Sequence, residues 1–148
     1  MDTALTTDFA DGTYRFWLPM SRVVAAEREM SREGYERSIL ALFYDIGEAL
    51  GQSVGQSVLA GSMAARLSEC QAVIRNALIG GDDGLVNGEN IAVSDTMARS
   101  LVDTYCYPAR PAMHDIALAW EILRVAIYGI DTSGSKKKEA DSEPLNPS

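Results

Sequence analysis

Residues 68–81, with the sequence SECQAVIRNALIGG, constrain the fold more than any other part of the chain. Ser68 is a suitable N-cap, and Gly80 and Gly81 are suited to end a helix in the left-handed conformation. Between these ends, apolar residues recur at helical spacing: Cys70, Val73, Ile74, Ala77 and Leu78. The pattern predicts a helix with one buried face at the centre of the fold.

The composition is that of one globular domain. The chain has 148 residues, 47% of them hydrophobic, which is enough to bury a core. It shows neither an apolar run of about 18 residues, the length that crosses a bilayer, nor a basic-then-apolar leader. We therefore expect a cytoplasmic protein without membrane association. In that compartment Cys70 and Cys106 are expected to be free thiols, with a single disulfide as the alternative.

The formal net charge of −8 at pH 7 restricts the partners. The cationic run at 136–138 is followed directly by acidic residues, so no basic surface for phosphates is expected. We therefore predict no nucleic acid binding. An acidic body favours solubility and is compatible with a basic protein partner.

Residues 3–18 predict a β-hairpin. Asp11-Gly12 is a strong tight-turn signal, and the alternation over 14–18 predicts one buried face. Because a two-stranded hairpin is marginally stable alone, it must pack on helices or extend the sheet of a partner. Trp17 falls on the other face, where it either covers a neighbouring element or anchors a partner.

Apolar periodicity predicts four further helices, at residues 20–34, 36–50, 95–107 and 112–129. Ser94 or Asp95 caps the third, and Gly129 ends the last. The buried side of the first is expected to carry Met20, Val23, Val24 and Glu27. The core stripe of the second is expected to be Ile39, Leu40, Phe43, Ile46 and Leu50.

Two segments are expected to lack a fixed structure. Residues 51–67, which contain a doubled GQSV, predict a flexible crossover that is partly helical near its end. Residues 131–148 have almost no apolar content and predict a disordered tail. The chain is thus expected to be mostly α, with about five helices and an N-terminal β-hairpin in a single domain, residues 1–130.

Residues 82–93 are expected to form a solvated loop. Asp82, Asp83 and Glu89 lie there with two asparagines, but their spacing does not follow that of a calcium-binding EF-hand loop. The glycines match neither phosphate-binding pattern. We therefore predict no metal site and no cofactor.

Candidates for catalysis are few. His114 is the single histidine, and Cys70 is its possible nucleophilic partner, but each has a structural explanation on its own helix. The cysteines form no CxxC, so zinc ligands are lacking. We predict no catalytic residue and no enzyme. Trp17 and Tyr107 are the candidate partner-binding residues.

Three segments taken in order carry a resemblance to a known family: DGTYRFWL (11–18), RNALIGG (75–81) and ALAWEILRVAIYGI (117–130). Over roughly residues 11–130 the chain resembles the small tail proteins of bacterial gene transfer agents and of long-tailed phages and prophages. That family is often labelled phage tail tube protein, and it is similar to the tail assembly chaperones of long-tailed phages. The segment GQSVGQSVLAG is longer here than in the family pattern.

The resemblance implies a mostly helical, non-enzymatic chaperone in the cytoplasm of a bacterial host. Such a protein binds the tape measure protein, keeps it soluble, helps tail tube subunits to assemble around it, and is absent from the mature particle. The resemblance carries no catalytic residue to this chain, and a homo-oligomer is compatible with it. The alternatives are a structural tail tube subunit and a small helical enzyme or ligand-binding domain.

Overall fold

The computed structural model describes residues 1–51 and 63–131. Within them lie five helices and four strands, so the predicted mostly α fold with an N-terminal β-hairpin is confirmed. Most of the predicted crossover and of the predicted tail lies outside the described residues. The elements in order are β1 (Leu5–Phe9), β2 (Gly12–Phe16), α1 (Met20–Met30), α2 (Ile39–Gly51), α3 (Met63–Gly81), β3 (Gly84–Val86), β4 (Glu89–Ile91), α4 (Asp95–Tyr105) and α5 (Ala112–Tyr128).

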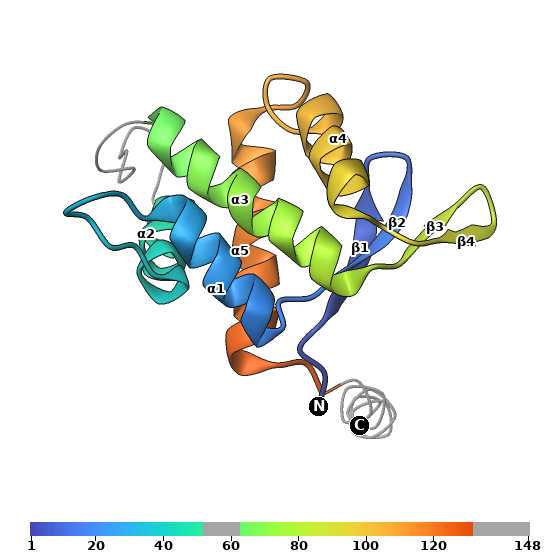
Figure 1. Cartoon of the computed structure of the whole chain (residues 1–148), viewed down its shortest axis with the longest axis horizontal. Coiled ribbons are helices and arrows are strands. Elements are labelled where there is room, and N and C mark those ends of the chain that lie inside the picture. The colour runs from blue at the N-terminus through green and yellow to red at the C-terminus, as the bar shows by residue number, and fades with distance from the viewer. Residues whose placement is uncertain (52–62, 132–148) are drawn as a thin grey trace, which may run out of the picture.

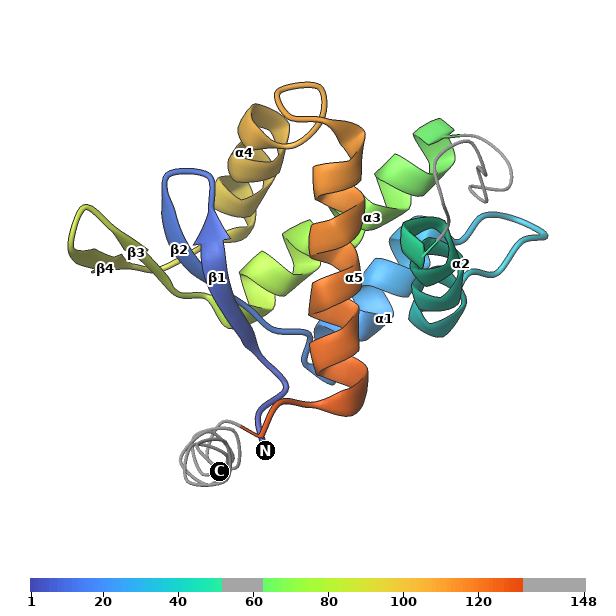
Figure 2. The same ribbon diagram turned by 180° about the vertical axis from the view of Figure 1, so that it is seen from behind.

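α3 is the central helix of the fold. It contacts α1, α4, α5 and strand β2. Figure 1 shows it running across the middle of the molecule with α5 behind it, and Figure 2 shows α5 from the other side. The predicted apolar stripe is fully buried: Cys70, Val73, Ile74, Ala77 and Leu78. The prediction of a central helix with one buried face is confirmed.

The first turn of α3 lies earlier than predicted. The helix begins at Met63, so Ser68 is an exposed residue within it and not its N-cap. The reason is that the residues before Ser68 (MAARL) are strong helix formers, which extend the helix by more than one turn.

The last turn of α3 also differs from the prediction. Gly80 and Gly81 are helical, and the left-handed residue that follows is Asp82, with φ 45°. Close packing explains the two glycines. A Cβ atom on Gly80 would strike the carbonyl oxygen of Trp17, and one on Gly81 would strike that of Arg15. The chain of β2 therefore lies directly against the end of α3.

β1 and β2 form the predicted antiparallel hairpin. The loop between them is Ala10-Asp11, with Ala10 at φ 56°, and Gly12 is already the first residue of β2. Tyr14 and Phe16 are buried, as the alternation predicts. The hairpin is stabilised by packing on α3 and by further strands, which meets the requirement stated from the sequence.

The predicted loop at 82–93 contains a second hairpin. β3 pairs with β2, and β4 pairs with β3, so the strand order in the sheet is β1-β2-β3-β4. Asn87 and Gly88, both with positive φ, lie between the two strands. Strands of three residues are too short to show an alternating pattern, which is why the sequence did not predict them. In Figure 1 this hairpin projects away from the helices.

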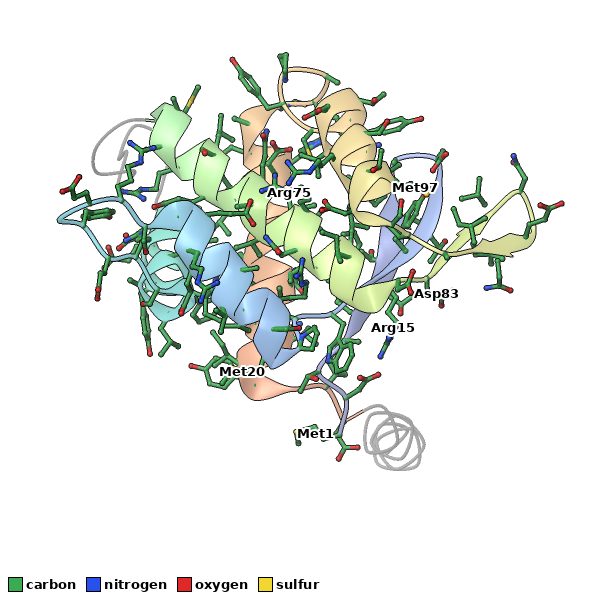
Figure 3. All side chains as sticks on the ribbon, in the orientation of Figure 1. Met1, Arg15, Met20, Arg75, Asp83 and Met97 are labelled. Carbon is green, nitrogen blue, oxygen red and sulfur yellow. The ribbon has the colours of Figure 1, made fainter. Side chains whose placement is uncertain are left out.

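The buried side of α1 differs in part from the one predicted. Val23 packs on the core with the buried Ala26 and Met30, whereas Val24 is exposed, as is Met20 at the start of the helix (Figure 3). The side that lies on α3 includes Arg22, which donates a hydrogen bond to Asn76 Oδ1 at 3.3 Å. Arg22 lies on the side that faces α3, and Met20, two residues earlier, lies on the other side of the helix.

α2 likewise differs from the prediction at two positions, Leu40 and Leu42. Leu42, Phe43 and Ile46 are buried, mainly against α5, whereas Leu40 is exposed although it was predicted in the core. At helical spacing Leu40 lies at the edge of the face formed by the three buried residues, beside exposed Tyr44.

The capping of the last two helices agrees with the sequence. The Ser94 hydroxyl accepts a hydrogen bond from the Met97 amide at 3.1 Å, and Gly129 follows α5 with φ 80°. Beyond α5 the chain returns to its beginning. The amides of Asp2 and Ile130 each donate to the other residue's carbonyl oxygen at 2.7 Å.

Candidate functional site

The two cysteines lie in the core as free thiols. Burial raises the pKa of Cys70 and of Cys106 to about 12 in each case. A thiol in this state is a poor nucleophile, because the reactive species is the thiolate. His114 is exposed near the start of α5. The environment of Cys70 is therefore that of a packing residue.

The acidic segment after α3 is used for local structure. Asp82 accepts a hydrogen bond from the Val93 amide at 2.8 Å, which ties the base of the second hairpin to the end of α3. Among residues 1–51 and 63–131, no three His, Cys, Asp or Glu side chains are grouped as a metal ion would require. Over the same residues, no helix is long and apolar enough to cross a membrane.

The two predicted partner-binding residues lie in different parts of the fold. Trp17, in the connection from β2 to α1, is half-buried, and its Nε1 donates to Thr3 at 3.0 Å. Tyr107 is exposed in the connection from α4 to α5, and its carbonyl oxygen accepts a hydrogen bond from Gln71 at 3.3 Å. The structure does not bring them together, and their role in binding stays a prediction.

The start of α2 is tied to α3 by buried charges. Arg37 and Glu69 are 8% and 6% exposed, and Arg37 Nη2 donates to Glu69 Oε1 at 3.2 Å. The same nitrogen lies 2.7 Å from Asp45 on α2, and Arg66 also pairs with Glu69. Burial opposes the charge of Arg37, but its acidic partners outweigh that effect and raise the pKa of the guanidinium. This network fixes the position of α2.

Phe43 is the centre of an aromatic cluster formed by α2 and α5. Its ring stacks on Trp120, with centroids 5.7 Å apart and an interplanar angle of 12°. Its centroid lies 5.8 Å from that of Tyr44 and 6.0 Å from that of Tyr128. Phe43 is buried, whereas Tyr44 and Tyr128 are 63% and 60% exposed. Gly47 makes room for the indole, because a Cβ atom there would lie 3.0 Å from Trp120 Nε1.

The outer side of α2 adds an aliphatic residue to the cluster. Leu40 lies one turn before Tyr44 and is 51% exposed. α2 carries two charged residues, Asp45 and Glu48, in thirteen positions, so apolar residues lie on its exposed side as well as on its buried side. Large apolar residues grouped on an exposed side mark a candidate binding surface. We call the following residues the α2 patch: Leu40, Tyr44, Trp120 and Tyr128.

An open groove of about 620 Å³ lies between α1 and the start of α2; no residue of the patch lines it, and it meets α2 at Ala41, the residue after Leu40. Exposed Val24 of α1 and Ala41 of α2 line it. Glu27, also in the groove, accepts a hydrogen bond from the Ile39 amide at 3.0 Å and thereby caps α2. The arrangement offers apolar and aromatic surface with charged residues beside it, and this composition is suited to binding a protein segment.

No protein-family model, curated protein or solved structure matches this chain. The α2 patch is therefore assigned from geometry alone. Sequence reasoning missed it because Leu40 was placed in the core and Tyr44 was not singled out. The available signal was the low charge of ILALFYDIGEALG, which leaves apolar residues on every side of the helix.

Proposed function

We propose that this chain is a non-enzymatic tail assembly chaperone that binds the tape measure protein through the α2 patch. The observation that carries the proposal is an aromatic cluster on α2 and α5 in which Tyr44 and Tyr128 are exposed, with Leu40 exposed one turn before Tyr44. Aromatic side chains dominate the binding energy of many interfaces, and such a face suits an amphipathic helix. The resemblance of residues 11–130 to phage and gene transfer agent tail proteins supports the choice of partner.

The proposed activity follows from covering apolar surface. Before tube subunits have assembled around it, a long helical tape measure protein exposes apolar stripes, and such stripes promote aggregation. A chaperone that covers one stripe at a time, and that itself carries a charge of −8, keeps the complex in solution.

Co-expression with the tape measure protein encoded nearby tests the proposal. The wild-type chain is expected to co-purify with that protein and to raise its soluble fraction. The double variant Leu40→Gln, Tyr44→Ser is expected to lose both effects while keeping its circular dichroism spectrum. Leu85→Gln is the matched control, because Leu85 is 45% exposed but lies on β3, away from the patch. Failure of the wild-type chain to bind or solubilise the partner would overturn the proposal.

A structural tail tube subunit is the second candidate. Tube subunits assemble through extensive β-sheet, and the projecting β3–β4 hairpin extends the sheet beyond the predicted pair of strands. Purified particles separate the two candidates. A chaperone is absent from them, whereas a tube subunit is among their most abundant proteins and forms rings or tubes when purified.

A further inference from the structure

We infer that the α2 patch binds a basic amphipathic helix, that is, one whose apolar stripe is flanked by lysine or arginine. This inference rests on the proposed function and adds the chemistry of the bound segment. It is drawn from the charges that surround the patch.

Acidic side chains outnumber basic ones around the α2 patch. Glu48 lies one turn after Tyr44 on the exposed side of α2, and Glu36 is exposed just before the helix. On α5, Arg124 lies 5.8 Å from the Trp120 ring and is paired with Glu121. Near the patch and the groove the acidic groups are Glu27, Glu36, Asp45, Glu48 and Glu121, and the basic groups are Arg28, Arg37 and Arg124; exposed Arg32 and Glu33 add one charge of each sign in the connection before α2.

The cations of this set are mostly neutralised within the protein. Arg37 pairs with Asp45 and Glu69, and Arg124 pairs with Glu121. Arg28 is an exposed cation of the groove, and the carboxylates of Glu27, Glu36 and Glu48 outnumber it, so an approaching helix meets a net negative charge. Complementary charge at the rim of an apolar site raises the association rate and rejects partners of the wrong sign.

A second copy of the chain fits the patch poorly. Two copies joined through the patch would bring the acidic side chains around each patch together, and each chain carries a formal charge of −8. Like charges juxtaposed across an interface disfavour association. A basic helix removes this repulsion and covers the same apolar residues.

The test uses two synthetic helical peptides of about 18 residues with the same leucine and alanine stripe, flanked by lysine in one and by glutamate in the other. Binding to the full chain is measured by fluorescence anisotropy. We expect the lysine peptide to bind at least about tenfold more tightly in 50 mM NaCl, and this ratio to fall several-fold in 500 mM NaCl, where charges are screened.

Variants assign the effect to the patch. Glu48→Lys is expected to lower the affinity for the lysine peptide several-fold. Glu89→Lys, on β4, changes the net charge equally and is expected to leave the affinity within about twofold of wild type. Leu40→Gln is expected to weaken both peptides.

Several results would overturn the inference. They are equal affinity for the two peptides, tighter binding of the glutamate peptide, no binding of either, or equal effects of the two charge reversals. A dimer that dissociates on Tyr44→Glu would assign the patch to a second copy instead. Binding of the tape measure protein separates this inference from the proposed function. If that binding is lost in the Leu40 and Tyr44 double variant but is unchanged by Glu48→Lys and by salt, the proposed function stands and the charge preference is refuted.

Discussion

Arg37 and Glu69 form a buried ion pair that joins the start of α2 to α3. Arg37 Nη2 donates to Glu69 Oε1, and Nε lies 3.0 Å from Oε2 without the alignment of a hydrogen bond. The α2 patch depends on this pair, because it fixes the helix that carries Leu40 and Tyr44.

Removing the carboxylate of this pair is expected to destabilise the protein strongly. Glu69→Ala leaves Arg37 and Arg66 together without their shared partner, and we expect a loss of about 3–5 kcal/mol in the free energy of unfolding. Urea unfolding followed by circular dichroism measures it. The control is Arg99→Ala, which removes an exposed pair and is expected to cost less than about 1 kcal/mol. Equal effects of the two variants would refute the structural role of Glu69.

The last residues of α3 and α2 are both glycines, Gly81 and Gly51, and they differ in what surrounds them. Gly81→Ala is expected to cost about 1–3 kcal/mol, because the new Cβ atom meets the backbone of Arg15 and forces the helix away from β2. Gly51→Ala, at the last position of α2, meets no atom of the described residues within 4 Å and is expected to stabilise α2 by about 0.5 kcal/mol through its helix propensity. Thermal unfolding of the two variants checks this difference in sign. If Gly81→Ala unfolded at or above the wild-type temperature, the close packing of β2 on α3 would be wrong.

The buried thiols make stability depend on alkaline pH. The folded pKa of Cys70 and of Cys106 is about 12, above the unfolded value of 9.0, so the folded state holds these protons more tightly. The stabilisation that the two protonated thiols give the folded state is fully present below pH 9 and is lost as the pH rises from 9 toward 12. Between pH 8 and pH 10 we expect the free energy of unfolding to fall by about 1 kcal/mol per thiol.

Urea unfolding at the two pH values measures this fall. The control is the variant Cys70→Ala, Cys106→Ala, in which the fall should be smaller by the contribution of both thiols. Unchanged pH dependence in that variant would contradict the prediction. The native thiols should also react with a disulfide reagent at pH 8 far more slowly than in urea.

Asp115 is the polar centre of the connection between α4 and α5. Its buried carboxylate accepts hydrogen bonds from Gln71 Nε2 at 2.9 Å and from the Tyr107 amide at 3.0 Å. Asp115→Ala leaves both donors without this acceptor, and we expect a loss of about 2–4 kcal/mol. Chemical denaturation compares it with Asp103→Ala, an exposed position where a change within about 0.5 kcal/mol is expected.

The helices were predictable because their apolar spacing and caps are local properties of the sequence. Ser94 and Gly129 mark helix ends by their own chemistry, and the structure agrees with both. Gly80 and Gly81 were misinterpreted because the same residue type serves two purposes. Whether a glycine ends a helix or admits a neighbouring strand depends on what packs against it, and the sequence does not state that contact.

The candidate site was less predictable for the same reason. Trp17 and Tyr107 were chosen as aromatic residues with uncertain burial, whereas the exposed cluster forms around Phe43 from two helices far apart in the chain. Leu40 and Leu42 are chemically identical neighbours. Which of them faces outward is decided by the packing of α2 on α5, a tertiary contact.

The two backbone hydrogen bonds between Asp2 and Ile130 have a consequence for engineering. Since these residues are adjacent, a short peptide can join them, and new termini can be opened at the exposed Asn87-Gly88 turn without breaking a helix. In Figure 1 that turn lies at the opposite end of the molecule from α2. A circular permutant would therefore carry a fluorophore, a tag or a surface anchor at a point remote from the α2 patch.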